Sequence, residues 1–263
     1  MASHKASGFL TGLAVLGRHH FTTADAMTAL GTSLPAVRAV LRRLAQRGEI
    51  AVPHRGFHVL VPPEYRSLGC LPAEQFVPQL MAHLGEHYYT ALLSAAELHG
   101  AAHHRPQAFQ VMVRAHRRAI ECGAVRVQFV ARADLERTTV VTRNTPRGLL
   151  AVASPEATAL ELVGYADHCG GLDNVATVIA DLAPSLDAVR LVAECRRCPV
   201  SWAQRLGFLL DRTEARELAE SLLPFVDEMA KTWAPLVRSV SRRGAVRETR
   251  WRLLVNAEVD PEP

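Results

Sequence analysis

The stretch between Phe21 and Val61 constrains the fold most, because two short helix patterns are followed there by a hairpin pattern. Thr22 and Asp25 are spaced as a capping box, which opens a first short helix. Ser33 then takes the cap position of a second helix whose first turn contains a proline. These signals predict two helices joined by a tight turn.

The second of these helices has two distinct faces. Its apolar residues recur at helical spacing and form an inward stripe: Leu34, Val37, Leu41 and Leu44. A rotation of about 100° per residue leaves small and polar residues on the outward face: Ala36, Ala39, Arg42, Arg43 and Gln46. Alanine lets a helix backbone come close to DNA, and arginine can donate paired hydrogen bonds to guanine edges or phosphates. The outward face therefore favours a helix that lies in a DNA major groove.

An alternating apolar pattern follows Gly48 and predicts a β-hairpin. Its apolar members are Ile50, Val52, Phe57, Val59 and Val61. Pro53-His54-Arg55-Gly56 interrupts the pattern, supplies the turn and places Arg55 at the tip. Two helices and this hairpin predict a winged helix-turn-helix. The alternative is an ordinary small helical domain whose basic face is merely solvated.

The charge of the N-terminal segment supports a nucleic-acid partner. Residues 1–66 carry a basic majority: Lys5, Arg18, Arg38, Arg42, Arg43, Arg47, Arg55 and Arg66. Only Asp25, Glu49 and Glu64 oppose them, so this segment supplies the surplus of a chain whose net charge is +4. Attraction to phosphates is the expected consequence. We predict DNA contacts from both helix and hairpin: Ser33, Arg38, Arg42, Arg43, Gln46, Arg47, His54 and Arg55.

The length of the chain, 263 residues, leaves room for this unit and one larger domain. Pro62-Pro63 breaks the exit of the hairpin, which predicts a DNA-binding domain at 1–66 and a second domain at 67–263. An apolar run at 8–17 resembles a signal peptide weakly, but Arg18-His19-His20 better fits the end of a first helix. No run approaches the roughly 18 apolar residues of a membrane span. We predict a cytoplasmic protein without a membrane partner.

The larger domain has the pattern of an α+β fold. Helix patterns cover 71–84 and 88–99, and four β-rich runs follow at 109–113, 125–130, 138–142 and 149–152. Their close spacing favours a small antiparallel or mixed sheet packed by helices. Ser154-Pro155-Glu156 then opens a series of helices at 157–167, 172–182, 186–197, 202–210 and 214–222. Residues 251–255 are expected to form a strand that returns to the sheet.

No group of residues predicts catalysis or metal binding. Cys195 and Cys198 have C-x2-C spacing, but a structural zinc site needs a second pair of ligands. His83 and His87 lack the glutamate that a metalloprotease helix places after its first histidine. A further cluster, His99, His103 and His104, suits capping, turn or surface roles.

Two glutamates are also better explained by helix structure than by catalysis. Glu156 belongs to a helix start, and Glu161 is assigned to the solvent face of the same helix. The five cysteines have no disulfide framework, which favours the reducing cytoplasm. We therefore predict no catalytic residue, no metal site, no cofactor and no enzymatic activity.

A second basic segment lies near the end of the chain. Its members are Lys231, Arg238, Arg242, Arg243, Arg247, Arg250 and Arg252. It forms either a solvated edge or a second phosphate-contacting patch. The preceding stretch at 211–228 is acidic, so the two segments are expected to pair in part.

Four stretches, in their order along the chain, resemble AbiEi-family antitoxins, the regulators of type IV toxin–antitoxin modules. They are Gly48-Glu49-Ile50 leading into the hairpin, Tyr88-Tyr89-Thr90-Ala91 continuing to His99-Gly100, Ser154-Pro155-Glu156 continuing to Leu162, and Gln204-Arg205-Leu206-Gly207-Phe208-Leu209-Leu210, with Trp251 to Asn256 closing. The resemblance covers nearly the whole length.

This resemblance implies a repressor of its own operon that binds inverted repeats, with a dimer on DNA left open. The larger domain would counteract a nucleotidyltransferase-like toxin, either by direct binding or only functionally. One departure is the hairpin, which carries fewer basic residues than is common for wings of the family.

Two other classes of protein remain as alternatives. A ligand- or metal-responsive transcription factor without a toxin partner would use the histidine and cysteine clusters of the larger domain. An enzyme with a DNA-targeting domain, such as a nuclease, is disfavoured because lysine occurs only at Lys5 and Lys231.

Overall fold

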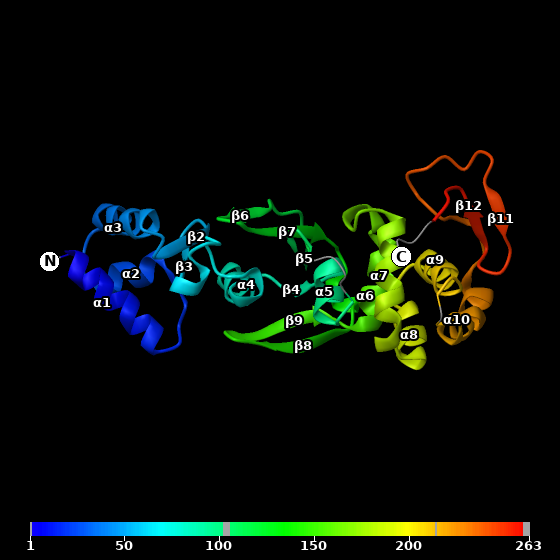
Figure 1. Cartoon of the computed structure of the whole chain (residues 1–263), viewed down its shortest axis with the longest axis horizontal. Coiled ribbons are helices and arrows are strands. Elements are labelled where there is room, and N and C mark those ends of the chain that lie inside the picture. The colour runs from blue at the N-terminus through cyan, green and yellow to red at the C-terminus, as the bar shows by residue number, and fades with distance from the viewer. Residues whose placement is uncertain (1, 102–105, 214, 260–263) are drawn as a thin grey trace. The chain divides into compact units, whose positions relative to one another are not determined.

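A computed structural model describes residues 2–101, 106–213 and 215–259 of the chain (Figure 1). The chain folds into two compact units. Unit 1 comprises Met1–Tyr88, Gln107–Ala133 and Thr142–Ala151, and unit 2 comprises Tyr89–Pro106, Asp134–Val141 and Val152–Pro263. Among the described residues, no helix has the length and apolar character needed to cross a membrane.

The N-terminal part of unit 1 alternates helices with a small sheet. Its elements are α1 (Ala2–Val15), β1 (His20–Thr22), α2 (Thr23–Leu30), α3 (Leu34–Gln46), β2 (Ile50–His54) and β3 (Phe57–Leu60). The antiparallel sheet has the order β1-β3-β2. The two helices and the hairpin expected from the sequence are present. The first helix was expected to end near His20, but it ends at Val15, because Gly17 turns the chain with a φ of 68°.

Local side-chain hydrogen bonds explain where α2 begins. The Thr22 hydroxyl accepts a bond from the Asp25 N–H at 3.1 Å, and the Asp25 carboxylate accepts one from the Thr22 N–H at 2.8 Å. This reciprocal pair confirms the predicted capping box. Gly31 ends the helix in the left-handed conformation, with φ 59° and ψ 41°.

Helix α3 begins differently from what its sequence suggested. Ser33 occupies the cap position, but its hydroxyl forms no capping hydrogen bond. Pro35 lies at the second helical position and has no N–H, which removes one of the two donors that a capping serine usually bonds. The Ser33 carbonyl still accepts the first helical bond, from the Val37 N–H at 2.9 Å.

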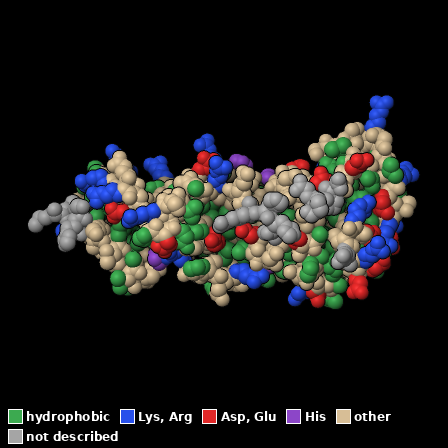
Figure 2. Space-filling view, viewed as in Figure 1, with side chains coloured by type: hydrophobic (Ala, Val, Ile, Leu, Met, Phe, Trp, Pro, Cys, Tyr) green, Lys and Arg blue, Asp and Glu red, His purple; other side chains and the backbone are tan. Residues whose placement is uncertain are grey.

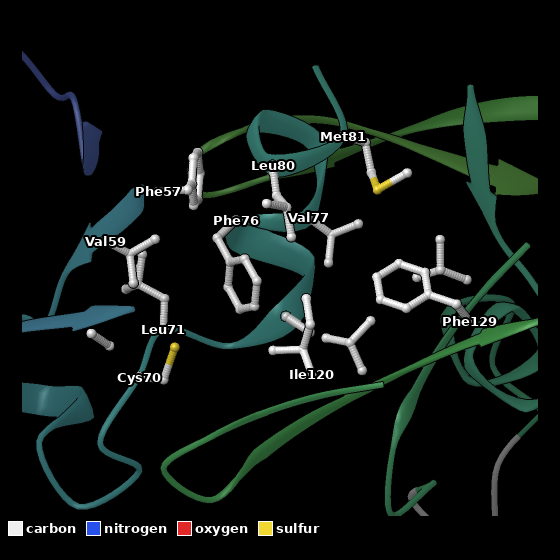
Figure 3. Close-up of a cluster of buried hydrophobic side chains, with 14 of the residues drawn as sticks. Phe57, Val59, Cys70, Leu71, Phe76, Val77, Leu80, Met81, Ile120 and Phe129 are labelled. Carbon is white, nitrogen blue, oxygen red and sulfur yellow. The ribbon is translucent and has the colours of Figure 1, made fainter. Parts of the chain in front are cut away.

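Two hydrophobic clusters pack against opposite faces of the hairpin β2–β3. The first joins α1, α2 and α3 to Ile50 and Leu60. The second joins Ala51, Phe57 and Val59 to residues 70–81 and to strands of the larger sheet (Figure 3). Alternate residues of a strand point to opposite faces, so β3 is buried along its whole length. Apart from its tip, the hairpin is therefore packed against a hydrophobic cluster on each face.

The remaining elements of the central region build a six-stranded mixed sheet. They are a 3-10 turn (Ala73–Gln75), α4 (Val77–Leu84), β4 (Tyr88–Thr90), β5 (Phe109–Val113), β6 (Ile120–Cys122), β7 (Val125–Ala131), β8 (Val140–Thr145) and β9 (Gly148–Ala153). The strand order is β6-β7-β5-β4-β9-β8. Strand β7 runs parallel to β5 and antiparallel to β6, and β4 runs parallel to β9. The expectation of a mixed sheet is confirmed.

Two helices predicted from sequence are shorter than expected. The helix predicted at 71–84 is a 3-10 turn followed by α4, and prolines at 72 and 78 fall at the starts of these two pieces. The helix predicted at 88–99 starts as strand β4, which pairs with β9 at Thr90 and Val152. Helix α5 (Leu92–Leu98) follows only after Leu92 turns the chain with a φ of 54°.

Unit 2 is mainly helical. Besides α5 it contains α6 (Pro155–Gly164), α7 (Leu172–Leu182), α8 (Ala188–Cys195), α9 (Val200–Leu210) and α10 (Arg216–Met229). The Ser154 hydroxyl caps α6 by accepting the Ala157 N–H at 3.1 Å, which confirms the predicted helix start. Helix α6 contacts α5, α7, α8 and α9. Because neighbours surround it, the assignment of Glu161 to a solvent face is wrong: Glu161 is 1% exposed.

The end of the chain forms a separate three-stranded sheet. Strands β10 (Ala234–Pro235) and β11 (Val246–Glu248) flank β12 (Leu253–Val255), parallel and antiparallel to it respectively. The strand predicted at 251–255 exists as β12, but it does not return to the six-stranded sheet. Its hydrogen-bond partners β10 and β11 both lie nearby in the sequence.

Candidate nucleic-acid interface

The outward face of α3 is exposed along the helix. The exposed residues are Ala36, Arg38, Ala39, Arg42, Arg43, Gln46 and Arg47, whereas Val37, Val40, Leu41 and Leu44 are buried. Helical geometry places Arg42 and Gln46 one turn apart, directly opposite the buried stripe. Arg38 lies on one flank of this line, and Arg43 and Arg47 lie on the other. Figure 2 shows Lys and Arg side chains over the region that α3 occupies in Figure 1.

An open groove of about 810 Å³ separates α3 from the hairpin β2–β3. Arg38 and Arg42 line it from α3, and Arg55 lines it from the hairpin. Three guanidinium groups therefore border one concave surface, although they come from two elements. Helix α2 contributes its small residues to the same groove, including Thr23 and Ala24.

A two-residue turn forms the tip of the hairpin. His54 pairs with Phe57, so Arg55 and Gly56 make the turn, and Gly56 adopts a φ of 82°. The carbonyl oxygen of Gly56 accepts a hydrogen bond from the Thr23 N–H at 3.0 Å, which ties the tip to the start of α2. Arg55 is exposed at this fixed tip, whereas His54 is only partly exposed.

Few carboxylates neutralise the arginines of this surface. Arg47 lies 3.6 Å from a Glu49 oxygen. The Nε of Arg43 donates to the Ala39 carbonyl of its own helix at 3.3 Å. Within the described residues, Arg38, Arg42, Arg43 and Arg55 form no ion pair with a carboxylate. Their positive charge is therefore available to an anionic partner.

A buried histidine supports the floor of the groove and was not singled out from the sequence. His58 of β3 is 5% exposed, stacks on Phe21 with ring centroids 5.1 Å apart, and places its Nε2 3.0 Å from the Thr23 hydroxyl. Burial lowers the pKa of His58 below its ordinary value, so the ring is neutral at pH 7. His58 therefore links β3 to α2 without adding charge to the surface.

The C-terminal basic segment is partly paired, as its acidic neighbour predicted. Arg250 binds Asp211 at 2.9 Å and Glu220 at 2.6 Å, and Arg252 lies 4.0 Å from Asp227. Another part of the segment is exposed in the loop between β10 and β11: Arg238, Arg242 and Arg243. The guanidinium groups of these three arginines form no ion pair with the carboxylates that the structure describes.

The described members of the histidine and cysteine clusters have local partners within the fold. Among the described residues, no group of three or more histidine, cysteine or acidic side chains is arranged to hold a metal ion. His103 and His104 lie outside these residues. His99 bonds the Ala153 carbonyl at 2.7 Å. Cys195 is fully buried, and the Cys198 thiol donates to the Glu194 carbonyl at 3.6 Å.

Buried glutamates of unit 2 have structural partners. Glu161 accepts a hydrogen bond of 2.6 Å from the Tyr89 hydroxyl and one of 3.3 Å from Thr138. Glu156, which is 2% exposed, binds Arg190 at 3.0 Å. These bonds offset the cost of burying the carboxylates. They connect α6 to residues that are distant in sequence.

The Tyr89–Glu161 bond gives a stability prediction. Tyr89→Phe is expected to lower the free energy of unfolding by about 2 kcal/mol, because a buried acceptor loses a short donor. Tyr65→Phe is the control, since that hydroxyl accepts a hydrogen bond from the neutral Gln75 amide at 3.0 Å, and it should cost about 1 kcal/mol or less. Urea unfolding followed by circular dichroism measures both. Equal losses would contradict the stronger role assigned to Tyr89.

Comparison with known proteins identifies the class of the larger region. Residues 89–212 match the family model of the AbiEi antitoxin C-terminal domain. This part of the chain is therefore similar to the C-terminal domain of AbiEi antitoxins. The match confirms the resemblance to AbiEi-family antitoxins that the sequence motifs indicated.

The complete fold also has a counterpart among solved structures. The crystal structure of the RV2827C protein from Mycobacterium tuberculosis superposes with a TM-score of 0.70, covering 96% of this chain and 92% of that chain. The two sequences are 18% identical, so the comparison shows a shared fold. No curated protein matches the chain.

Proposed function

We propose that the chain is a DNA-binding antitoxin of a type IV toxin–antitoxin module that represses its own operon. A winged helix-turn-helix at 1–66 binds inverted repeats in the operator. The domain at 67–263 counteracts a nucleotidyltransferase-like toxin, by direct contact or only functionally. The protein acts in the cytoplasm and catalyses no reaction.

One observation carries the DNA-binding part of this proposal: the outward face of α3 is exposed, basic and bordered by a groove that Arg55 of the hairpin also lines. The major groove of B-DNA is about 12 Å wide and admits one α-helix. Ala36 and Ala39 are small and exposed, so they allow the helix backbone to approach the base edges. The order α1-β1-α2-α3-β2-β3 agrees with a winged helix-turn-helix.

The geometry of α3 suggests a role for each side chain. Arg42 and Gln46 lie at the centre of the exposed face and are assigned to base edges. The flanking arginines and the Ser33 hydroxyl are assigned to phosphates. At the hairpin, Arg55 reaches the backbone or the minor groove, and His54 lies beside it. The residues assigned to phosphates on α3 are Arg38, Arg43 and Arg47.

Arginine variants test these roles. Arg42→Ala is expected to weaken operator binding by about 1–3 kcal/mol and to relax specificity at one base pair. Arg43→Ala should instead weaken binding to all sequences and reduce the slope of log affinity against log salt by about 1. If it instead costs about 1–3 kcal/mol and alters specificity, Arg43 contacts a base edge. Fluorescence anisotropy with DNA from upstream of the gene measures both.

Arg216→Ala provides the matched control, because Arg216 is an exposed arginine at the start of α10 in unit 2. It should leave operator affinity unchanged. If Arg42→Ala binds as tightly as the unaltered chain, the basic face of α3 does not read DNA. Binding stoichiometry on one and two half-sites shows whether two copies occupy the inverted repeat.

Co-expression tests the antitoxin part separately. The unaltered chain is expected to restore growth of cells that express the neighbouring nucleotidyltransferase-like gene. Arg42→Ala should lose repression of a reporter driven by the upstream DNA but still restore growth. If neither the unaltered chain nor Arg42→Ala restores growth, the assigned toxin is wrong. If the unaltered chain restores growth but does not repress the reporter, the operator assignment is wrong.

A further inference from the structure

Two cysteines from distant parts of the sequence lie together in unit 1. Cys70 is in the loop after β3, and Cys122 is the last residue of β6. The loop and the strand end are in backbone contact, because the Ala124 N–H donates to the Leu68 carbonyl at 2.7 Å. Both cysteines are free thiols in the structure.

The glycines beside these cysteines show how closely the two backbones approach. A Cβ on Gly123 would lie 2.1 Å from the Leu68 oxygen and 2.9 Å from the Gly69 Cα. A Cβ on Gly69 would lie 3.2 Å from the Gly123 Cα. Both glycines also have a left-handed φ, of 61° at Gly123 and 68° at Gly69. Backbone packing therefore holds Cys70 and Cys122 next to each other.

The two cysteines pack in one hydrophobic cluster, which also contains residues of the hairpin β2–β3. Cys70 is fully buried in the second hydrophobic cluster (Figure 3), and Cys122 is partly buried at its edge. Interaction with the Cys70 thiol lowers the pKa of Cys122 below its ordinary value, and the nearby Val52 N–H also lowers it. Strand β6, which ends at Cys122, contacts strand β2 of the hairpin.

We propose that Cys70 and Cys122 form a reversible disulfide on exposure to peroxide, and that this bond alters the hairpin β2–β3 through the contact between β6 and β2. In a reducing compartment, a disulfide of this kind is transient and reports oxidant stress. The site would make the DNA-reading unit sensitive to oxidation.

The chemistry needs one hydrogen peroxide as the oxidant. The Cys122 thiolate attacks one peroxide oxygen, a sulfur–oxygen bond forms as the O–O bond breaks, and the released hydroxide takes a proton to become water. The Cys70 sulfur then attacks the sulfenic sulfur of Cys122. The S–S bond forms as the S–O bond breaks, and the departing hydroxide leaves as a second water with the Cys70 proton. Two thiols lose two electrons, and one peroxide is reduced to two waters.

Other cysteines are less suited to begin this reaction. Burial raises the pKa of Cys169 to about 12 and also raises the pKa of Cys195. The thiolate is the reactive species, so these buried thiols react slowly near neutral pH. Cys122 combines partial exposure with an adjacent resolving thiol.

Disulfide formation changes what Val52 contacts. The sulfur atoms must come within about 2.05 Å of each other, so the Cys122 sulfur moves towards Cys70 and loses its negative charge. The Val52 N–H then loses its favourable interaction with the Cys122 thiolate. Because one hydrogen bond contributes about 1 kcal/mol, amide exchange at Val52 should rise about fivefold.

Peroxide treatment of the full chain, followed by alkylation and peptide mapping, tests the proposal. We expect one linkage, joining Cys70 to Cys122, that dithiothreitol reverses and that forms faster as pH rises, because the thiolate is the attacking species. Cys70→Ala should give no linkage and instead a dimedone-reactive sulfenic acid at Cys122. Cys198→Ser is the control, since it replaces another partly buried cysteine and should leave the linkage intact.

Two outcomes would overturn the proposal. If Cys70 and Cys122 stay reduced while Cys195 or Cys198 is oxidised, the pair is not the reactive site. If the linkage forms but amide exchange at Val52 is the same in oxidised and reduced protein, the hairpin does not respond to it. Both readouts are independent of DNA binding, so they distinguish this proposal from the repressor function.

Discussion

Operator binding should weaken by about 150-fold when the salt concentration rises from about 50 mM to about 200 mM. The phosphate contacts assigned to each copy of the chain come from Arg38, Arg43, Arg47 and Arg55, which are all exposed. Each neutralised phosphate contributes about −0.9 to the slope of log affinity against log salt, which gives about −3.6 for these contacts. Fluorescence anisotropy across a salt series measures the slope.

Single arginine substitutions test which side chains produce this salt dependence. Arg55→Ala should reduce the slope by about 0.9, because the hairpin tip contributes one phosphate contact. Arg216→Ala should leave it unchanged. A flat salt series for the unaltered chain would show that the arginines of α3 are only solvated.

Gly207→Ala should destabilise unit 2 by about 3 kcal/mol or more. A Cβ at this position would lie 2.2 Å from Cζ3 and 2.3 Å from Cη2 of Trp251. The indole cannot move aside easily, because its Nε1 donates to Asp211 at 2.6 Å and its backbone N–H donates to Glu248 at 2.8 Å. The added methyl group must therefore displace α9 or the loop before β12.

Thermal unfolding is a direct measurement for this variant. A loss of about 3 kcal/mol corresponds to a fall of about 6–12 °C in Tm for a domain of this size. Gly12→Ala is the matched control, because nothing lies within 4 Å of a Cβ built on this helical glycine. It should stabilise α1 by about 1 kcal/mol. Equal effects of the two substitutions would contradict the packing described for Trp251.

Local signals in the sequence predicted the parts of the fold that depend on neighbouring residues. The capping box at Thr22 and Asp25 and the start of α6 at Ser154 depend on atoms a few positions apart, and both form as expected. The exposed face of α3 was also predictable, because the period of its apolar residues fixes which side is buried.

Features that depend on distant residues were missed or assigned wrongly. Strand β1 has only three residues and exists because β3 pairs with it. Glu156 and Glu161 are buried because four helices enclose α6, which no helical period reveals. The contact between Cys70 and Cys122 has no sequence signal except the neighbouring glycines.

The two-sided burial of β3 has a consequence for how chains with this fold diverge. Residues on the outward side of α3 are exposed, so substitutions there cost little stability. Substitutions in the body of the hairpin disturb both clusters at once. Among related chains, we expect the outward face of α3 to vary freely while the hairpin stays nearly constant.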